Sequence, residues 1–96
     1  MQTYITLWKY TKDGLVDIKK TPKNFELVKK IIDHAGGTLL SIYGLVGKYD
    51  VITIMEMPDE KVAASTILRI CSTGRITSQT MTALSIDDFL KIAEQI

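Results

Sequence analysis

Four segments of the chain alternate apolar or β-branched residues with polar ones, at the period of two that is typical of β-strands. They run from Tyr4 to Tyr10, from Thr38 to Val46, from Asp50 to Met57 and from Ile76 to Leu84. Turn residues follow the first segment at Asp13-Gly14 and the third at Pro58-Asp59. The pattern therefore predicts four strands.

Apolar residues recur at helical spacing between these strands. Thr21-Pro22 is a helix start, with a capping hydroxyl before a proline at the first helical position, and Gly36-Gly37 supplies a left-handed cap. The first helix is therefore predicted from Pro22 to Ala35. A second helix is predicted within residues 59–74, and Ser85 opens a short terminal helix.

The connection Gly47-Lys48-Tyr49-Asp50 joins the second and third strands. Gly47 allows the positive φ that a tight connection needs, and so short a link makes the two strands antiparallel neighbours. The elements then follow in the order strand, helix, strand, strand, helix, strand and terminal helix. This order predicts an α+β, ferredoxin-like fold, because a right-handed crossover of the first helix leaves a gap that the third strand fills.

In this fold a four-stranded antiparallel sheet carries both long helices on one face, and the short C-terminal helix follows. The whole chain, residues 1–96, is expected to form one domain, since folding of a chain this long buries roughly two-thirds of its accessible surface. The other face of the sheet is left without a helix.

Residue parity divides the strand side chains between the two faces. The more uniformly aliphatic set is predicted to lie under the helices: Ile5, Leu7, Leu40, Ile42, Ile52, Ile54, Met81 and Ala83. The opposite set is predicted to form the open face: Tyr4, Thr6, Trp8, Tyr10, Leu39, Ser41, Tyr43, Leu45, Val51, Thr53, Met55, Met57, Ile76, Ser78, Thr80 and Thr82. That second set carries aromatic rings and hydroxyls but no charge.

An uncharged open face of roughly 400 Å² needs a cover, because soluble monomers rarely expose a larger apolar patch. A second copy stacked sheet on sheet approaches the ~800 Å² per partner of ordinary interfaces. We therefore expect a homodimer or a larger homo-oligomer. The interface residues, or the lining of a small polar pocket between the sheets, are expected to be Trp8, Tyr43, Met55, Tyr4 and Thr53.

The charge is nearly balanced at +1 and forms no basic stripe, which argues against nucleic-acid and membrane-surface partners. Cys71 is alone, so an internal disulfide is excluded and a reducing compartment is indicated. The first residues lack the basic start and long apolar core of a signal peptide, and no segment approaches the ~20 apolar residues of a membrane span. We expect a soluble cytoplasmic protein.

Tyr49 and Asp50 are the candidate acid/base or ligand-orienting pair, since they place a phenol and a carboxylate at the end of the sheet. The structural alternative is that Asp50 satisfies turn amides and Tyr49 packs under the hairpin. His34 lies in the last turn of the predicted helix, and we expect it to cap that helix or to lie on the surface. Cys71 lies on an apolar helix stripe, and we expect it to be an inert core thiol. With one histidine and one cysteine, we expect no metal site and no cofactor.

The segment Ser72-Thr73-Gly74-Arg75 offers a second hypothesis, anion binding through Arg75. It lacks the spacing of a phosphate-binding loop, and a simple connecting turn is the alternative.

Several short motifs resemble the GYD-domain family. The family's opening resembles Thr3-Tyr4-Ile5-Thr6-Leu7, and its eponymous hairpin resembles Gly47-Lys48-Tyr49-Asp50-Val51-Ile52. Its strand-to-helix junction resembles Glu56-Met57-Pro58-Asp59. The resemblance covers roughly residues 3–88. It implies a dimeric α/β barrel whose ferredoxin-like subunits pair through their sheets, and no settled activity. One segment departs: relatives tend to alternate Arg and Glu in the last strand, where this chain has Ile76-Thr77-Ser78-Gln79-Thr80-Met81.

Three functional interpretations follow. The preferred one is a non-catalytic oligomeric module that binds a small molecule between its sheets. The second is a cofactor-independent oxygenase or isomerase of the dimeric-barrel type, with Tyr49, Asp50, Tyr43 and Trp8 as its site. The third is a pure assembly subunit. A cavity of roughly 300 Å³ or more with convergent polar groups favours the first two over the third.

Overall fold

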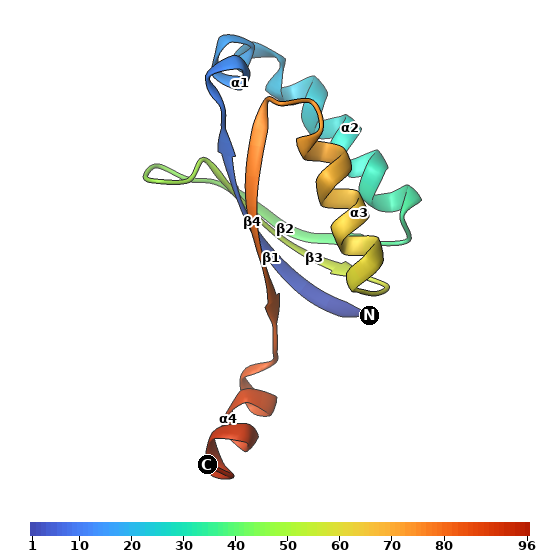
Figure 1. Cartoon of the computed structure of the whole chain (residues 1–96), viewed down its shortest axis with the longest axis vertical. Coiled ribbons are helices and arrows are strands. Elements are labelled where there is room, and N and C mark those ends of the chain that lie inside the picture. The colour runs from blue at the N-terminus through green and yellow to red at the C-terminus, as the bar shows by residue number, and fades with distance from the viewer.

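The computed structural model describes residues 1–96, and its elements follow the predicted order. The strands are β1 (Gln2–Tyr10), β2 (Thr38–Gly44), β3 (Val51–Met57) and β4 (Ile76–Ala83); the helices are α1 (Lys12–Val16), α2 (Thr21–His34), α3 (Glu60–Cys71) and α4 (Ile86–Glu94), with a 3-10 turn at Ile18–Lys20. In Figure 1, α2 and α3 lie side by side over one face of the sheet, while α4 stands away from the body.

The four strands form one antiparallel sheet in the order β2-β3-β1-β4. The first and third strands are central, as expected when a right-handed crossover leaves space that a later strand fills. The predicted α+β, ferredoxin-like fold is confirmed. None of the helices combines the length and apolar character needed to cross a membrane.

Two of the predicted helix boundaries rest on the expected caps. The carboxylate of Asp59 accepts the Val62 N–H at 2.9 Å, and the Ser85 hydroxyl accepts the Asp88 N–H at 3.1 Å. Gly36 has φ +82°, as predicted for a left-handed residue after α2. Sequence signals within one turn therefore determine these ends.

Two local predictions are wrong. Thr21 is the first residue inside α2 and does not cap it; Lys20 is the capping residue, and the Thr21 hydroxyl instead lies 3.1 Å from the Tyr10 hydroxyl. Gly47 does not have a positive φ. The connection between β2 and β3 spans residues 45–50, and a loop of this length turns without a left-handed residue.

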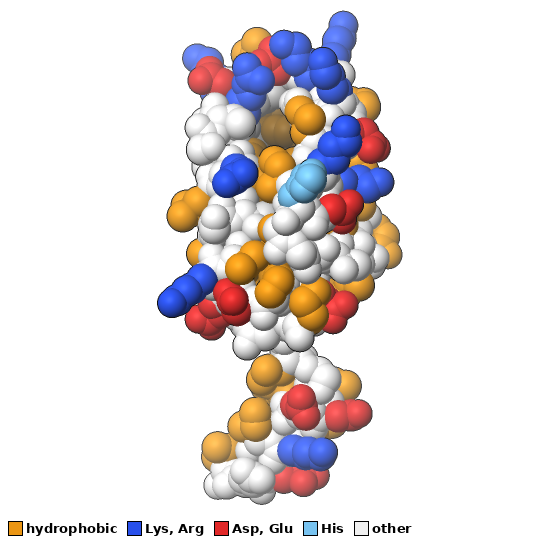
Figure 2. All heavy atoms as spheres, turned by 90° about the vertical axis from the view of Figure 1, so that its right-hand side faces the viewer, with side chains coloured by type: hydrophobic (Ala, Val, Ile, Leu, Met, Phe, Trp, Pro, Cys, Tyr) orange, Lys and Arg blue, Asp and Glu red, His pale blue; other side chains and the backbone are white.

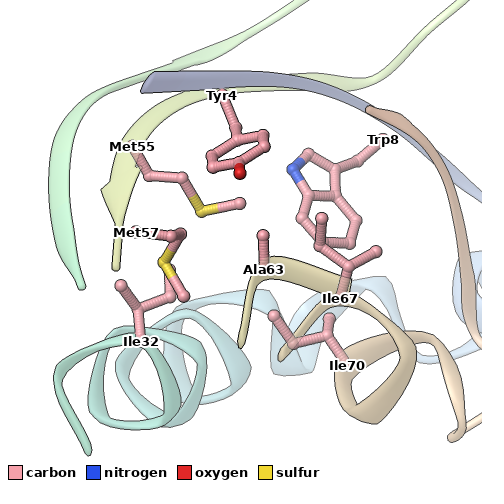
Figure 3. Close-up of a cluster of buried hydrophobic side chains, with 8 residues drawn as sticks. All are labelled: Tyr4, Trp8, Ile32, Met55, Met57, Ala63, Ile67 and Ile70. Atoms are coloured by element: carbon pink, nitrogen blue, oxygen red, sulfur yellow. The ribbon is translucent and has the colours of Figure 1, made fainter. Parts of the chain in front are cut away.

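The assignment of the two sheet faces is also wrong, because the structure reverses it. Tyr4, Thr6 and Trp8 of β1 are at most 3% exposed, under the helices. Met55 and Met57 of β3 are fully buried beside them, and Figure 3 shows these side chains pointing toward Ile32 of α2 and Ala63, Ile67 and Ile70 of α3. The aliphatic residues of β1, β3 and β4 therefore lie on the face without helices, whereas Ile42 and Tyr43 of β2 lie on the faces predicted for them.

Side-chain length explains the reversal. Packed layers are separated by about 10 Å, and small or β-branched helix residues such as Ala63 and Ile67 reach across only part of that distance. The long methionines and the rings of Tyr4 and Trp8 fill the remainder. A signal for this arrangement exists in the sequence: Lys9 and Glu56 share the parity of the aliphatic set, and charges avoid a helix-covered core.

Strand β2 departs from simple parity through a β-bulge. The register shifts between Leu39 and Ser41, so Leu40 is an extra residue and the alternation changes phase. Ile42 then pairs with Thr53 of the helix-covered face, and Tyr43 pairs with Ile52 of the other face. A pattern of period two cannot reveal such an insertion.

Ionisation of the Tyr4 phenol makes the stability of the folded state depend on pH. Burial raises its pKa above the ordinary 10.0, and the Glu60 and Asp59 carboxylates raise it further. The folded state thus favours the neutral phenol, so this contribution to stability is complete below pH 10.0 and is lost as the pH rises above it.

We expect Tyr4→Phe to weaken the decline in unfolding free energy above about pH 10, because the replaced ring has no proton to lose. Urea unfolding between about pH 8 and pH 11 measures this slope. The wild-type protein provides the reference slope. Equal slopes in the wild type and in Tyr4→Phe would contradict the expectation.

Helix α4 packs against no part of its own chain body. Every residue from Leu84 to Ile96 is exposed. Its apolar residues nevertheless follow the spacing of one helix face: Ile86, Phe89, Leu90 and Ala93. An isolated helix shorter than ~12 residues is marginal in water, so this helix requires a surface to pack on.

Candidate functional site

The helix-covered side of the sheet contains a cavity of about 250 Å³ between β1, β3, α2 and α3, which we call the helix-side cavity. In Figure 2 a hollow with hydrophobic side chains in it lies near the end of the molecule where Lys and Arg side chains gather. Its lining consists of Trp8, Tyr10, Thr21, Asn24, Phe25, Leu27, Val28, Ile31, Ile42, Val51, Thr53, Arg69, Ile70, Thr73, Arg75 and Ile76.

Two pairs of polar side chains in this cavity already form hydrogen bonds with each other. The Trp8 indole N–H donates to the Thr53 hydroxyl at 3.0 Å, and both residues are 3% exposed. The hydroxyls of Tyr10 and Thr21 pair with each other at 3.1 Å. These groups therefore present aromatic and aliphatic surface to the cavity and demand no polar partner from a ligand.

The charged part of the cavity lining consists of two guanidinium groups. Arg69 belongs to the last turn of α3, and Arg75 follows the left-handed residue Gly74. Arg75 forms an ion pair with Asp17 at 3.1 Å through one terminal nitrogen, and no carboxylate lies within ion-pair distance of Arg69. Both arginines of the chain thus lie at this one cavity.

The opposite face of the sheet, here called the open face, carries the apolar residues Ile5, Leu7, Tyr43, Ile52, Ile54, Met81 and Ala83 and the polar residues Thr3, Lys9, Ser41, Glu56, Thr77 and Gln79. Ile54 is central, with Ile5 of β1 and Ser41 of β2 as its cross-strand neighbours. Met81 is 40% exposed and Tyr43 63% exposed, so both present apolar surface on this face.

The hairpin residues Tyr49 and Asp50 connect the loop between β2 and β3 to strands β1 and β4 through hydrogen bonds. The Asp50 carboxylate accepts the Tyr10 N–H at 2.8 Å, and its own N–H donates to the Trp8 carbonyl at 2.8 Å. The Tyr49 hydroxyl donates to the Gln79 side-chain oxygen at 2.6 Å, which ties the loop to β4. These contacts favour the structural alternative for both residues.

The five residues predicted to form one ligand or interface site are divided by the sheet. Trp8 and Thr53 line the helix-side cavity, while Tyr4 and Met55 are enclosed in the core. Tyr43 lies on the open face. A single site between two sheets cannot contain all five.

The remaining candidates are placed as follows. His34 is exposed in the last turn of α2. Cys71 packs partly buried against the core, and its thiol lies 3.5 Å from the Ser78 hydroxyl. No group of three His, Cys, Asp or Glu side chains comes together in a way that could hold a metal ion.

Neither Arg69 nor the apolar wall from Phe25 to Ile31 was predicted from the sequence as part of a site. Thr73 and Arg75, which the sequence indicated as part of an anion-binding turn, do line the cavity. The available signal was composition, since the basic residues are lysines at every position except these two arginines. Their convergence depends on the packing of α3 against the sheet, which no local pattern encodes.

A family model described as GYD domain matches residues 4–93. The chain is also 26% identical over 91 residues to a Thermus thermophilus protein named glutamine synthetase and cystathionine beta-lyase binding protein, covering 94% of this chain and 96% of that protein. The relative therefore aligns along nearly its whole length.

Solved structures share the fold. A feast or famine regulatory protein from M. tuberculosis, complexed with L-methionine, matches with a TM-score of 0.66 and 10% identity over 88% of this chain. The match spans about half of that regulator, 51% of its length. A second structure, FFRP-DM1, matches over its full length with a TM-score of 0.61 and 20% identity. Since the family model spans nearly the whole sequence, the chain belongs to the GYD-domain family.

Proposed function

We propose that this protein is a non-catalytic module that associates with itself and binds a small ligand. The observation that carries the proposal is the division of apolar surface by one sheet: an uncovered aliphatic face on one side and a partly enclosed cavity on the other. The first is suited to a second copy of the chain and the second to a small molecule.

Association through the open face follows from its area and chemistry. Its two central strands carry aliphatic residues, with Ser41 and Gln79 on the flanking strands and the charges of Lys9 and Glu56 at the two ends of the strands. The face measures roughly 400 Å² in projection, which is large for an uncovered patch on a monomer. A twofold dimer would cover both copies at once, because the same patch serves each subunit.

Helix α4 supplies further apolar area to the same assembly. It follows β4 directly, and β4 contributes Met81 and Ala83 to the open face. The sheet area alone falls short of the ~800 Å² that each partner buries in an ordinary interface. We place the apolar stripe of α4 against the partner subunit, where it would complete that area.

We expect Phe89→Ser with Leu90→Ser to raise the dissociation constant of the oligomer about tenfold, since both side chains are only half-exposed before association. Sedimentation velocity over a dilution series measures this constant. The control, Lys91→Ser with Glu94→Ser, changes the same helix outside the stripe. Equal dissociation constants for the two variants would remove α4 from the interface.

Ligand binding is supported by the cavity and by a solved structure of the same fold. The Thermus thermophilus relative is named for binding two enzymes, which supports a binding role without supporting a small ligand, whereas the M. tuberculosis regulator was solved with a small molecule bound. The enzymatic alternative finds less support, because the contacts of Tyr49 and Asp50 are structural and the two residues lie outside the cavity lining.

Light scattering at micromolar concentration, combined with native mass spectrometry of gently purified protein, tests both parts of the proposal. We expect an integral multiple of the chain mass, with a small molecule retained. A stable monomer would overturn self-association. Turnover of a retained substrate would overturn the non-catalytic role.

A further inference from the structure

We propose that the helix-side cavity binds a small amphipathic carboxylate, with its apolar body against Trp8 and its anionic head at Arg69 and Arg75. This inference rests on the proposed ligand-binding function and specifies its ligand class. It comes from three independent properties of the cavity: the sign of its charges, the pairing of its polar groups and its volume.

The charges that line the cavity have one sign. Arg69 and Arg75 are its ionic side chains, and none of the 11 acidic residues of the chain belongs to the lining. Arg75 engages Asp17 through one terminal nitrogen, which leaves other N–H donors of its planar fork available. Arg69 has no carboxylate partner at all. An anion therefore finds charge-assisted donors here.

A cation or a zwitterion meets no matching group. The ammonium of an amine or amino acid needs an acceptor with negative charge, and the lining offers hydroxyls and an amide only. The hydroxyls of Thr53, Tyr10 and Thr21 are already engaged within the protein. Placing an ammonium near two guanidiniums would cost electrostatic free energy without compensation.

The volume restricts the apolar body. A cavity of ~150 Å³ accommodates benzene, so the 250 Å³ observed here accommodates about ten non-hydrogen atoms. The walls contributed by Phe25, Val28 and Ile70 are aliphatic or aromatic, which favours a chain or a single ring over a sugar or a nucleotide. Octanoate, with about ten non-hydrogen atoms, has this size and polarity.

The experiment uses the fluorescence of Trp8, the one tryptophan of the chain, because it belongs to the cavity lining. Full-length protein is titrated with butanoate, hexanoate, octanoate and decanoate. We expect affinity to increase about fourfold for each added methylene up to octanoate and then to level off, since the cavity is then full. Octylamine, octanol and L-methionine are expected to bind more weakly than octanoate.

Charge variants separate the two guanidiniums from general electrostatics. Arg69→Gln should weaken octanoate binding about tenfold, as expected for loss of one charge-assisted contact, and leave octanol binding unchanged. Lys23→Gln is the matched control, because it removes one positive charge beside the lining residues of α2 without lining the cavity. Its effect on octanoate binding should be less than about twofold.

The outcomes are distinguishable. Equal affinity for octylamine and octanoate, or no effect of Arg69→Gln, would overturn the carboxylate assignment while leaving ligand binding intact. If none of the probes alters Trp8 fluorescence, the carboxylate assignment fails, whereas the ligand-binding part of the proposed function is tested separately by native mass spectrometry. Self-association is measured separately by light scattering, so its outcome does not depend on these titrations.

Discussion

Replacing Ile54 by aspartate is expected to convert the oligomer into monomers. Ile54 lies at the centre of the open face, opposite Ile5 of β1 and Ser41 of β2. A carboxylate enclosed there by a second subunit would have no cationic partner, and an unpaired buried charge costs several kcal/mol. We therefore expect the dissociation constant to rise at least about 100-fold, since 1.4 kcal/mol corresponds to a factor of ten.

Sedimentation equilibrium and light scattering measure the effect. The control variant is Ala64→Asp, which introduces the same charge at an exposed position of α3 on the helix-covered side. Ala64→Asp should form an oligomer of the same mass as the wild-type protein. Circular dichroism must show that both variants remain folded, which is expected because Ile54 lies outside the buried core. An unchanged mass for folded Ile54→Asp would refute association through the open face.

Replacing Gly14 by alanine is expected to lower the unfolding free energy by about 2–3 kcal/mol. The added methyl group would overlap the Arg75 carbonyl oxygen and press against the Tyr10 ring. The backbone is held close at this point, because the Thr11 N–H donates to the Arg75 carbonyl at 3.0 Å and the Thr11 hydroxyl to the Gly74 carbonyl at 2.8 Å. The clash therefore cannot be relieved by one side chain moving.

For a domain of this size, the loss corresponds to a decrease in melting temperature of about 10 °C or more. Gly47→Ala is the matched control, since nothing lies within 4 Å of an added methyl group there and its φ is not positive. It should change the unfolding free energy by less than about 0.5 kcal/mol. Because Gly14 supports Arg75, octanoate binding by the folded fraction of Gly14→Ala should also weaken. Equal stability of the two alanine variants would show that the approach of α1 to Arg75 is not tight.

The course of the chain through the sheet was predictable because each element depends on signals close to it. Alternation defined the strands, and Asp59 and Ser85 defined two helix starts through hydrogen bonds within one turn. The errors arose where a longer-range contact competes with a local signal. The Thr21 hydroxyl pairs with the Tyr10 hydroxyl instead of capping α2. Gly47 does not adopt a positive φ, because the loop is longer than the predicted tight connection.

The candidate site was predictable only in part. Trp8 and Thr53 were identified as ligand residues, but their neighbours in the structure come from α2 and α3 and not from a second sheet. Arg69 is separated from Trp8 by 61 positions, as the residue numbers show, and the two line one cavity only after α3 packs on the sheet. Sequence periodicity predicts which face of its own helix or strand a side chain occupies. It does not predict how α3 packs against the sheet.

The amino-acid sequence by itself determined the order of elements, the ferredoxin-like topology and the presence of apolar side chains on both sheet surfaces, because these depend on local propensity and on the handedness of crossovers. Only the tertiary structure decided which surface the helices cover. Both surfaces are apolar, so burial energy alone does not distinguish them. The choice depends on side-chain length against the ~10 Å separation of the layers, which places Trp8 and Met55 inside and leaves Ile54 for a partner.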